Sequence, residues 1–221
     1  MRIGVDFGGT KIEAAALDDA GVVVARVRRP NPGGYELALE AVRDLVAEVE
    51  GLVGPASVGV GMPGSVSPRS GAIRGANSTW LNGRPFREDL EAALGRPVRL
   101  ANDANCLALS EASDGAAAGA QVVFAVIVGT GCGGGLVVDG RIVEGANGIG
   151  GEWGHTPLPW PSAEEQAVPP CWCGRCEASP RACAPSRPAS RCAATTRSSA
   201  SPAGPSRRAS MCTPTTSTWD R

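Results

Sequence analysis

The chain has 221 residues, a formal net charge of -1 at pH 7 and 43% hydrophobic residues. This length is enough to bury the core of one large domain or two small ones. The near-zero charge argues against binding to nucleic acid or to a membrane through a basic surface. No apolar run is long enough to span a bilayer, and Met1 leads into a predicted strand without a signal peptide, so we expect a cytoplasmic protein.

The first predicted element is a strand over Arg2–Phe7, followed by Gly8-Gly9-Thr10-Lys11. The two glycines allow the backbone to turn sharply and to approach a ligand closely. Backbone N–H groups and Lys11, the only lysine of the chain, suit the phosphates of a nucleotide, and Asp6 suits Mg²⁺. The spacing is not that of a Walker A loop. The alternative interpretation is an ordinary β-hairpin turn before a second strand.

The remaining pattern predicts an α/β fold with mixed sheets. We expect Val22–Arg28 to pair with the first strand through a turn at Asp18–Gly21. Further strands are predicted at Ser57–Met62, Val98–Leu100, Val122–Val128, Leu136–Val138 and Arg141–Val143, and helices at Tyr35–Glu50, Phe86–Leu94 and from Asn102 to about Ala117.

A second glycine-rich segment, Gly129 to Gly135, follows the apolar strand Val122–Val128. It repeats the chemistry of the N-terminal segment, with Gly129, Thr130, Gly131 and Gly133 as candidate phosphate-binding residues. Two such turns in two lobes would clamp a triphosphate from opposite sides.

Asn102-Asp103-Ala104-Asn105 stands between a predicted strand and a predicted helix. One interpretation is helix capping, for which Asn and Asp are favoured. The functional interpretation makes Asp103 a general base for a substrate hydroxyl, with Asn102 bonded to a neighbouring hydroxyl. The segment from Asn77 to Gly83 adds polar side chains and Trp80, a composition that suits a sugar but also a turn.

The only histidine, His155, precedes a group of cysteines. Three thiolates and one imidazole would form a closed tetrahedral zinc site, here from His155, Cys171, Cys173 and Cys176. In a secreted protein eight cysteines would predict disulfides, whereas in a cytosolic protein they favour thiols and metal ligands.

Taken together, these motifs resemble those of the ROK-family sugar kinases within the actin-like ATPase superfamily. The matching segments are Asp6-Phe7-Gly8-Gly9-Thr10-Lys11, Gly61-Met62-Pro63-Gly64, Asn102-Asp103-Ala104-Asn105, Gly129-Thr130-Gly131-Cys132-Gly133-Gly134-Gly135 and Glu152-Trp153-Gly154-His155. The resemblance implies an actin-like, ribonuclease H-like α/β fold of two lobes. The segments around Asn77 and Glu152 are most similar to the bacterial fructokinase/mannokinase branch.

The resemblance also implies ATP-dependent phosphorylation of a hexose hydroxyl. Asp103 would be the base, and Asn77, Asn102, Glu152 and His155 would hold sugar hydroxyls. Asp6, Gly8, Gly9, Thr10 and Lys11 would hold ATP and Mg²⁺ together with the second glycine segment, and Zn²⁺ would order the sugar-binding loop. Fructose is the expected sugar, with glucose, mannose or an N-acetylated hexosamine as alternatives. Whether the chain forms a homodimer stays open.

The sequence departs from the family pattern near residue 176. The family's third cysteine would fall at position 178, which holds Ala178, and Cys176 comes two residues earlier. Residues 177–221 contain no Leu, Ile, Val, Phe or Tyr, so we expect them to be disordered, as a natural tail or as the product of a shifted reading frame. The expected organisation is an N-terminal lobe (1–117), an incomplete second lobe (118–176) and this tail (177–221). A catalytically impaired sugar-binding remnant is the alternative function.

Overall fold

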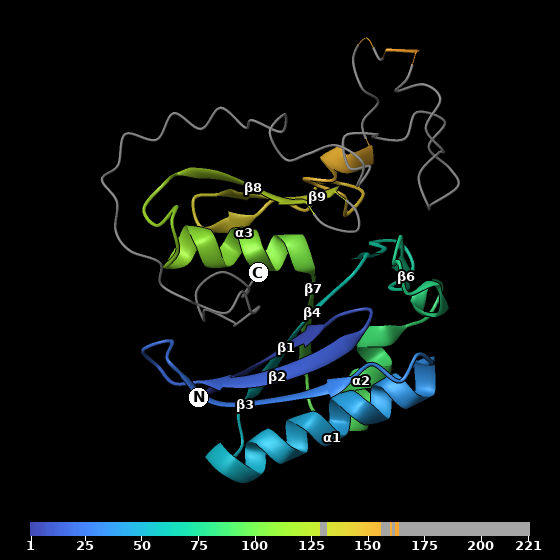
Figure 1. Ribbon diagram of the computed structural model, residues 1–221, viewed down its shortest axis with the longest axis vertical. Coiled ribbons are helices and arrows are strands. Elements are labelled where there is room, and N and C mark those ends of the chain that lie inside the picture. The colour runs from blue at the N-terminus through green and yellow to red at the C-terminus, as the bar shows by residue number, and fades with distance from the viewer. Residues whose placement is uncertain (129–131, 156–159, 161, 164–221) are drawn as a thin grey trace.

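The computed structural model describes residues 1–128, 132–155, 160 and 162–163 (Figure 1). Its strands are β1 (Arg2–Phe7), β2 (Lys11–Leu17), β3 (Val23–Pro30), β4 (Ser57–Met62), β5 (Ser65–Val66), β6 (Ile73–Arg74), β7 (Val98–Asn102), β8 (Val122–Val128), β9 (Cys132–Val138) and β10 (Arg141–Ile142). Its helices are α1 (Tyr35–Val53), α2 (Phe86–Leu94), α3 (Asp103–Ser113) and two short 3₁₀ helices, η1 (Thr79–Leu81) and η2 (Trp153–His155). Across these ranges, no helix is long and apolar enough to cross a membrane. The alternation of strands and helices confirms the α/β prediction.

The first sheet has five strands in the order β3-β2-β1-β4-β7. Strand β1 pairs antiparallel with β2 and parallel with β4, so the sheet is mixed, as expected. Helices α1 and α2 cover one face of it in Figure 1. The apolar stripe of α1, which includes Val42, Leu45 and Val46, is completely buried with Ile3 and Val60 of the sheet. This packing fixes the ends of β1 and β7, where the candidate site lies.

One strand was missing from the sequence prediction. Lys11–Leu17 forms β2, which lies between β1 and β3, so the prediction that Val22–Arg28 pairs directly with the first strand is wrong. All residues of β2 after Lys11 are buried. A strand buried on both faces shows no alternation of apolar and polar residues, and the alanines of this segment gave no strand signal of their own.

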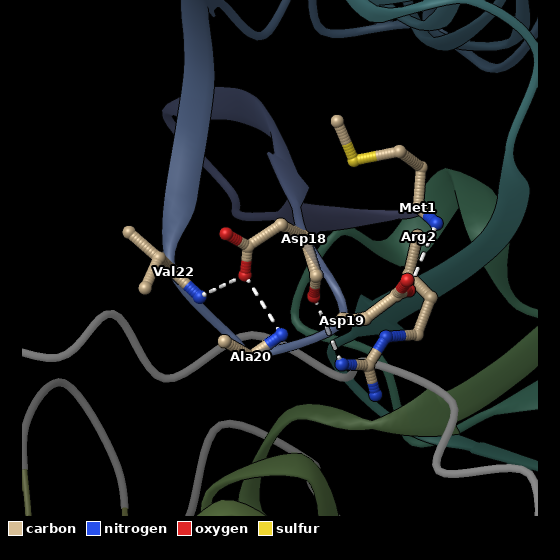
Figure 2. Close-up of polar contacts among 6 residues, drawn as sticks. All are labelled: Met1, Arg2, Asp18, Asp19, Ala20 and Val22. Atoms are coloured by element: carbon tan, nitrogen blue, oxygen red, sulfur yellow. Dashed lines mark hydrogen bonds and ion pairs between the residues drawn. The ribbon is translucent and has the colours of Figure 1, made fainter.

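The turn between β2 and β3 lies at Asp18–Val22, one residue longer than the predicted turn at Asp18–Gly21 (Figure 2). The side-chain Oδ1 of Asp18 accepts hydrogen bonds from the N–H groups of Ala20 (2.9 Å) and Val22 (2.8 Å). The guanidinium of Arg2 donates to the carbonyl of Asp18 (3.2 Å). This turn lies at the end of the sheet opposite the glycine segment, because β1 runs from Arg2 towards Gly8.

The second sheet has the order β10-β9-β8, and α3 packs against it (Figure 1). A small core of Ala108, Leu109, Val123 and Val137 joins the helix to the sheet. The helix ends at Ser113, earlier than the predicted end near Ala117.

The opposite face of β8 is exposed in the described part of the chain. Val122, Phe124 and Val126 alternate along the strand and are 62%, 49% and 46% exposed. Side chains two residues apart point to the same face of a strand, so these three form one apolar surface.

The two cysteines in the described ranges are not the free thiols or metal ligands that the sequence analysis expected. Cys106 lies in α3 and Cys132 begins β9, and both are disulfide-bonded. The other six cysteines, from Cys171 onward, lie outside the described residues.

Candidate active site

The first glycine segment is the hairpin connection between β1 and β2. The N–H of Gly8 donates to the carbonyl of Lys11 (2.9 Å), which confirms the β-hairpin interpretation of this segment. Gly9, Thr10 and Lys11 are exposed. Among the described residues, the N–H groups of Gly9 and Thr10 make no hydrogen bond, so they are available to an anion. A hairpin turn and a phosphate-binding segment are therefore compatible at this position.

Asn31 forms two hydrogen bonds to the backbone of this hairpin. Its side-chain amide donates to the carbonyl of Gly8 (2.7 Å), and its backbone N–H donates to the carbonyl of Thr10 (3.0 Å). Its Oδ1 accepts from the N–H of Gly33 (3.0 Å), which fixes the side chain itself. Sequence reasoning missed Asn31, because its partners are carbonyl groups of a segment that is distant in sequence.

Asp6 lies at the end of β1, opposite Glu13 of β2. Burial raises the pKa of Asp6, and the nearby charge of Glu13 raises it further, while Lys11 and Arg28 lower it. Glu13 is only 6% exposed and forms ion pairs with Arg26 and Arg28. The carboxylate of Asp6 is therefore placed where a cation would relieve the local negative charge.

Asn102 and Asp103 stand where β7 meets α3. The Oδ1 of Asn102 accepts from the N–H groups of Ala104 (2.9 Å) and Asn105 (3.3 Å), so the capping interpretation is confirmed for Asn102. Its amide nitrogen donates to the carbonyl of Gly64 (2.9 Å) and keeps a second N–H for another acceptor. The cap holds the first turn of α3, and with it Asp103, at the end of the sheet.

The surroundings of Asp103 make it a stronger base than an ordinary aspartate. Burial raises the pKa of Asp103, and the carboxylate of Asp6 raises it further, whereas the N–H of Ala104 and the side chain of Asn102 lower it. The Asp103 side chain nevertheless remains accessible to solvent at its surface. The structure thus brings the two predicted carboxylates from two distant segments into one electrostatic environment.

The segment that carries Asn77 packs against the same region. Gly64 has φ +82°, and a methyl group on it would lie 2.7 Å from the backbone nitrogen of Ala76. Asn82 holds the segment by accepting from the N–H of Ala76 (2.9 Å) and donating to its carbonyl (3.1 Å). Asn77, exposed and next to Ala76, therefore emerges beside the Gly64 turn that Asn102 contacts.

The hairpin also approaches this segment. A methyl group at Gly9 would lie 3.9 Å from Oγ of Ser78. The first glycine segment, the Asn77 segment and the start of α3 thus gather at one end of the first sheet.

The predicted sugar-binding motif around Glu152 lies against the second sheet. Glu152 precedes η2, and its backbone N–H donates to the carbonyl of Ile149 (3.1 Å). The indole Nε1–H of Trp153 donates to the carbonyl of Gly133 in β9 (2.8 Å). His155 ends η2, and its side chain lies outside what the structure describes.

Part of the second glycine segment differs from the prediction. Gly133, Gly134 and Gly135 belong to strand β9 rather than to a loop. Glycine is needed there because both faces are closely packed: a methyl group at Gly135 would lie 2.5 Å from the carbonyl oxygen of Ala104, and one at Gly134 would lie 2.7 Å from that of Gly151.

The other predicted ligands lie outside the described residues: Gly129, Thr130, Gly131, Cys171, Cys173 and Cys176. Within residues 1–128, 132–155, 160 and 162–163, no group of three or more His, Cys, Asp or Glu side chains is arranged to hold a metal. The zinc site therefore stays a prediction.

Comparison with known proteins gives a consistent family. The ROK family profile matches residues 2–184. An N-acetyl-D-glucosamine kinase of Pectobacterium atrosepticum is 47% identical over 161 residues, which are 72% of this chain and 53% of that protein. The chain thus spans about half the length of the curated relatives it matches.

Comparison with solved structures gives the same family. A ROK hexokinase of Thermus thermophilus matches with a TM-score of 0.67 and 39% identity over 78% of this chain and 56% of that one. A ROK glucokinase of Streptomyces griseus, in complex with glucose and AMPPNP, matches with a TM-score of 0.65 and 31% identity over 72% and 51%. The chain belongs to the ROK family and has its actin-like α/β fold.

Proposed function

We propose that this chain carries the catalytic and first phosphate-binding segments of an ATP-dependent hexose kinase. The observation that supports this proposal most is the placement of Asp103 at the start of α3, within the electrostatic field of Asp6. Asp6 itself lies in β1 two residues before Gly8, and the N–H groups of Gly9 and Thr10 in the hairpin turn make no hydrogen bond in the described part of the chain. A base and an anion-binding turn at one end of a sheet are the parts that phosphoryl transfer to a hydroxyl requires.

In the proposed reaction, Asp103 takes the proton of a hexose hydroxyl. The hydroxyl oxygen then bonds to the γ-phosphorus, and the bond from that phosphorus to the bridging oxygen breaks, giving a sugar phosphate and ADP. The raised pKa of Asp103 favours acceptance of the proton near neutral pH. The second N–H of Asn102, with Asn77, Glu152 and His155, would hold neighbouring hydroxyls.

The residues at this site suit Mg²⁺. Asp6 is a carboxylate whose pKa is raised by burial and by Glu13, and hard oxygen ligands are those that Mg²⁺ prefers. Asp6 would hold the ion directly or through water, and a bound Mg²⁺ would neutralise charge on the phosphate oxygens. Lys11 and the N–H groups of Gly9 and Thr10 would contact the phosphates themselves.

The sugar is a hexose in this proposal, and its identity needs a direct test. The segments at Asn77 and Glu152 favour fructose, whereas curated relatives that are 44–47% identical are N-acetyl-D-glucosamine kinases. Glucose is present in the Streptomyces griseus structure. We therefore place N-acetyl-D-glucosamine beside fructose as the first candidates, followed by glucose and mannose.

The test is sugar-dependent formation of ADP by the purified 221-residue chain with Mg²⁺ and ATP. The proposal expects one or more of these hexoses to raise ADP formation above the rate without sugar, with a phosphorylated hexose as the second product. ADP formation that is independent of every hexose, together with no detectable binding of any of them, would overturn it.

A second candidate function is sugar binding without turnover. The exposed apolar face of β8, formed by Val122, Phe124 and Val126, favours this alternative because such a face is normally covered in a stable lobe. Calorimetric titration separates the two functions. A hexose that binds with measurable heat while no ADP forms would support the binding protein over the kinase.

A further inference from the structure

A row of three charged side chains crosses the first sheet and ends at the proposed Mg²⁺ ligand. Asp6 of β1 lies directly opposite Glu13 of β2, and Glu13 lies directly opposite Arg28 of β3. Directly opposite residues of antiparallel strands share one face of a sheet, with Cβ atoms about 4.5–5.5 Å apart. Asp6, Glu13 and Arg28 therefore follow one another across a single face of the sheet.

This face is the one opposite α1. Ile12, next to Glu13, is completely buried in the core to which α1 contributes, so Glu13 points away from that core. Arg29, next to Arg28, lies on the α1 face and pairs there with Glu48 (2.5 Å). Strand β3 thus carries two arginines that make ion pairs on opposite faces of the sheet.

Glu13 is a buried carboxylate that is held in place beside Asp6. It is only 6% exposed, and Nε of Arg26 lies 3.3 Å from its Oε1 while Arg28 pairs with its Oε2. These two cations compensate the burial of its charge. Burial is the largest cause of the raised pKa of Asp6. Glu13 raises this pKa further and Arg28 lowers it, so both charges act on Asp6.

We propose that Glu13 and Arg28 are positioning residues that set, with opposite signs, how strongly Asp6 holds Mg²⁺. The inference rests on the proposed function, in which Asp6 is the Mg²⁺ ligand, and goes beyond it because neither residue need touch the ion. A divalent cation at Asp6 is attracted by the carboxylate of Glu13 and repelled by the guanidinium of Arg28. If the pair only supported the fold, replacing either residue would weaken binding.

The experiment measures the dissociation constant of a non-hydrolysable ATP analogue by calorimetry, once with Mg²⁺ and once with a chelator in its place. The ratio of the two constants is the gain in affinity that Mg²⁺ provides, and it requires neither hexose nor turnover. The variants are Glu13→Gln and Arg28→Gln. Arg29→Gln is the matched control, because it makes the same change one residue away, on the other face of β3. Circular dichroism confirms that each variant is folded.

We expect Glu13→Gln to lower this gain by about 5- to 30-fold, because the attraction between a carboxylate and a divalent cation is lost. Arg28→Gln should raise the gain by about 2- to 5-fold. Its effect is smaller because Arg28 is two strands away from Asp6 and its side chain is 53% exposed, so solvent screens its charge. Arg29→Gln should keep the parent's gain within about 2-fold.

The outcomes separate this inference from the proposed function. If either Glu13→Gln or Arg28→Gln keeps the parent's gain, or if both lower it, the charge role is wrong while the kinase proposal stands. Should Glu13→Gln fail to fold, Arg28→Gln decides alone: a raised gain supports the role, and any other value overturns it. A parent chain that binds the analogue equally well with and without Mg²⁺ also refutes the inference. If the parent chain binds neither the analogue nor any hexose, the proposed function fails, and the inference fails with it.

Discussion

The side-chain amide of Asn31 donates a 2.7 Å hydrogen bond to the carbonyl oxygen of Gly8, 23 residues earlier in the chain. The same residue binds the carbonyl of Thr10 through its backbone. Asn31 therefore occupies the carbonyl oxygens of both Gly8 and Thr10. The N–H groups of the turn can then face a phosphate without competition from carbonyl oxygens.

Removing the Asn31 amide should weaken nucleotide binding. We expect Asn31→Asp to reduce affinity for Mg²⁺ and ATP by about 5- to 10-fold, because the donor to Gly8 is lost while the acceptor for Gly33 remains. The affinity for hexose, measured without nucleotide, should change by less than about 2-fold in the same variant. Calorimetric titration of both ligands measures this. An equal loss for both ligands would show that Asn31 supports the whole fold rather than the hairpin.

Lys11 offers a direct chemical test of the proposed phosphate-binding segment. It is exposed and is the only lysine of the chain, so an amine-reactive acetylating reagent has Lys11 and the Met1 amine as its main targets. We expect Mg²⁺ and ATP at ten times the dissociation constant to slow acetylation of Lys11 by about 10-fold, as mass action predicts. The Met1 amine, at the opposite end of β1, is the internal control in the same mass spectrum. Equal labelling of Lys11 with and without nucleotide would remove it from the phosphate site.

Replacing Gly64 should lower the stability of the fold for two reasons, its positive φ and its close contact with Ala76, whereas at Gly83 only the positive φ applies. Alanine at Gly64 (φ +82°) should cost about 1–2 kcal/mol for the backbone conformation and about 1–3 kcal/mol more for the contact with Ala76. Alanine at Gly83 (φ +83°, with nothing within 4 Å) should cost only the first amount. Urea unfolding measures both free energies. Equal losses would mean that the close approach of Gly64 to the Asn77 segment does not affect stability.

The charge of Asp6 should be visible in the pH dependence of turnover. Asp103 must be ionised to accept a proton, and its pKa is raised, so activity should fall on acidification at a higher pH than an ordinary aspartate would give. Asp6→Asn removes a like charge, which should lower the pKa of Asp103 and move this acid limb to lower pH. The rate should also fall, because Asp6 is the proposed Mg²⁺ ligand. Glu13→Gln is the control, since Glu13 raises the pKa of Asp6 and not that of Asp103. An acid limb that stays in place in Asp6→Asn would contradict the electrostatic pairing.

Much of the fold could be predicted from the sequence because its elements carry clear periodic patterns. The stripe of α1 and the bounds Phe86–Leu94 of α2 were predicted from apolar residues at helical spacing. β2 was missed because a central strand buried on both faces has no alternation, and its alanines favour no strand.

The candidate site also has residues that the sequence predicted and residues that it did not. Motifs predicted Asp6 and Asp103 as candidate site residues, because each stands near the end of a predicted strand in a recognisable context. The contacts of Asn31 and Trp153 could not be predicted, since each side chain donates a hydrogen bond to a backbone carbonyl of a distant segment. Gly133 was assigned to a loop because a glycine run resembles one, whereas close packing on both faces makes that run a strand.

The central claim is that Asp103 is the base of a hexose kinase, and Asp103→Asn tests it most directly. The measurement is sugar-dependent ADP formation, paired with calorimetric hexose binding on the same preparation. We expect turnover to fall by about 10²- to 10⁴-fold while hexose affinity stays close to that of the parent chain. Because burial raises the pKa of Asp103, a neutral amide there should not destabilise the fold at neutral pH. Turnover near the parent rate in a folded Asp103→Asn variant would contradict the account.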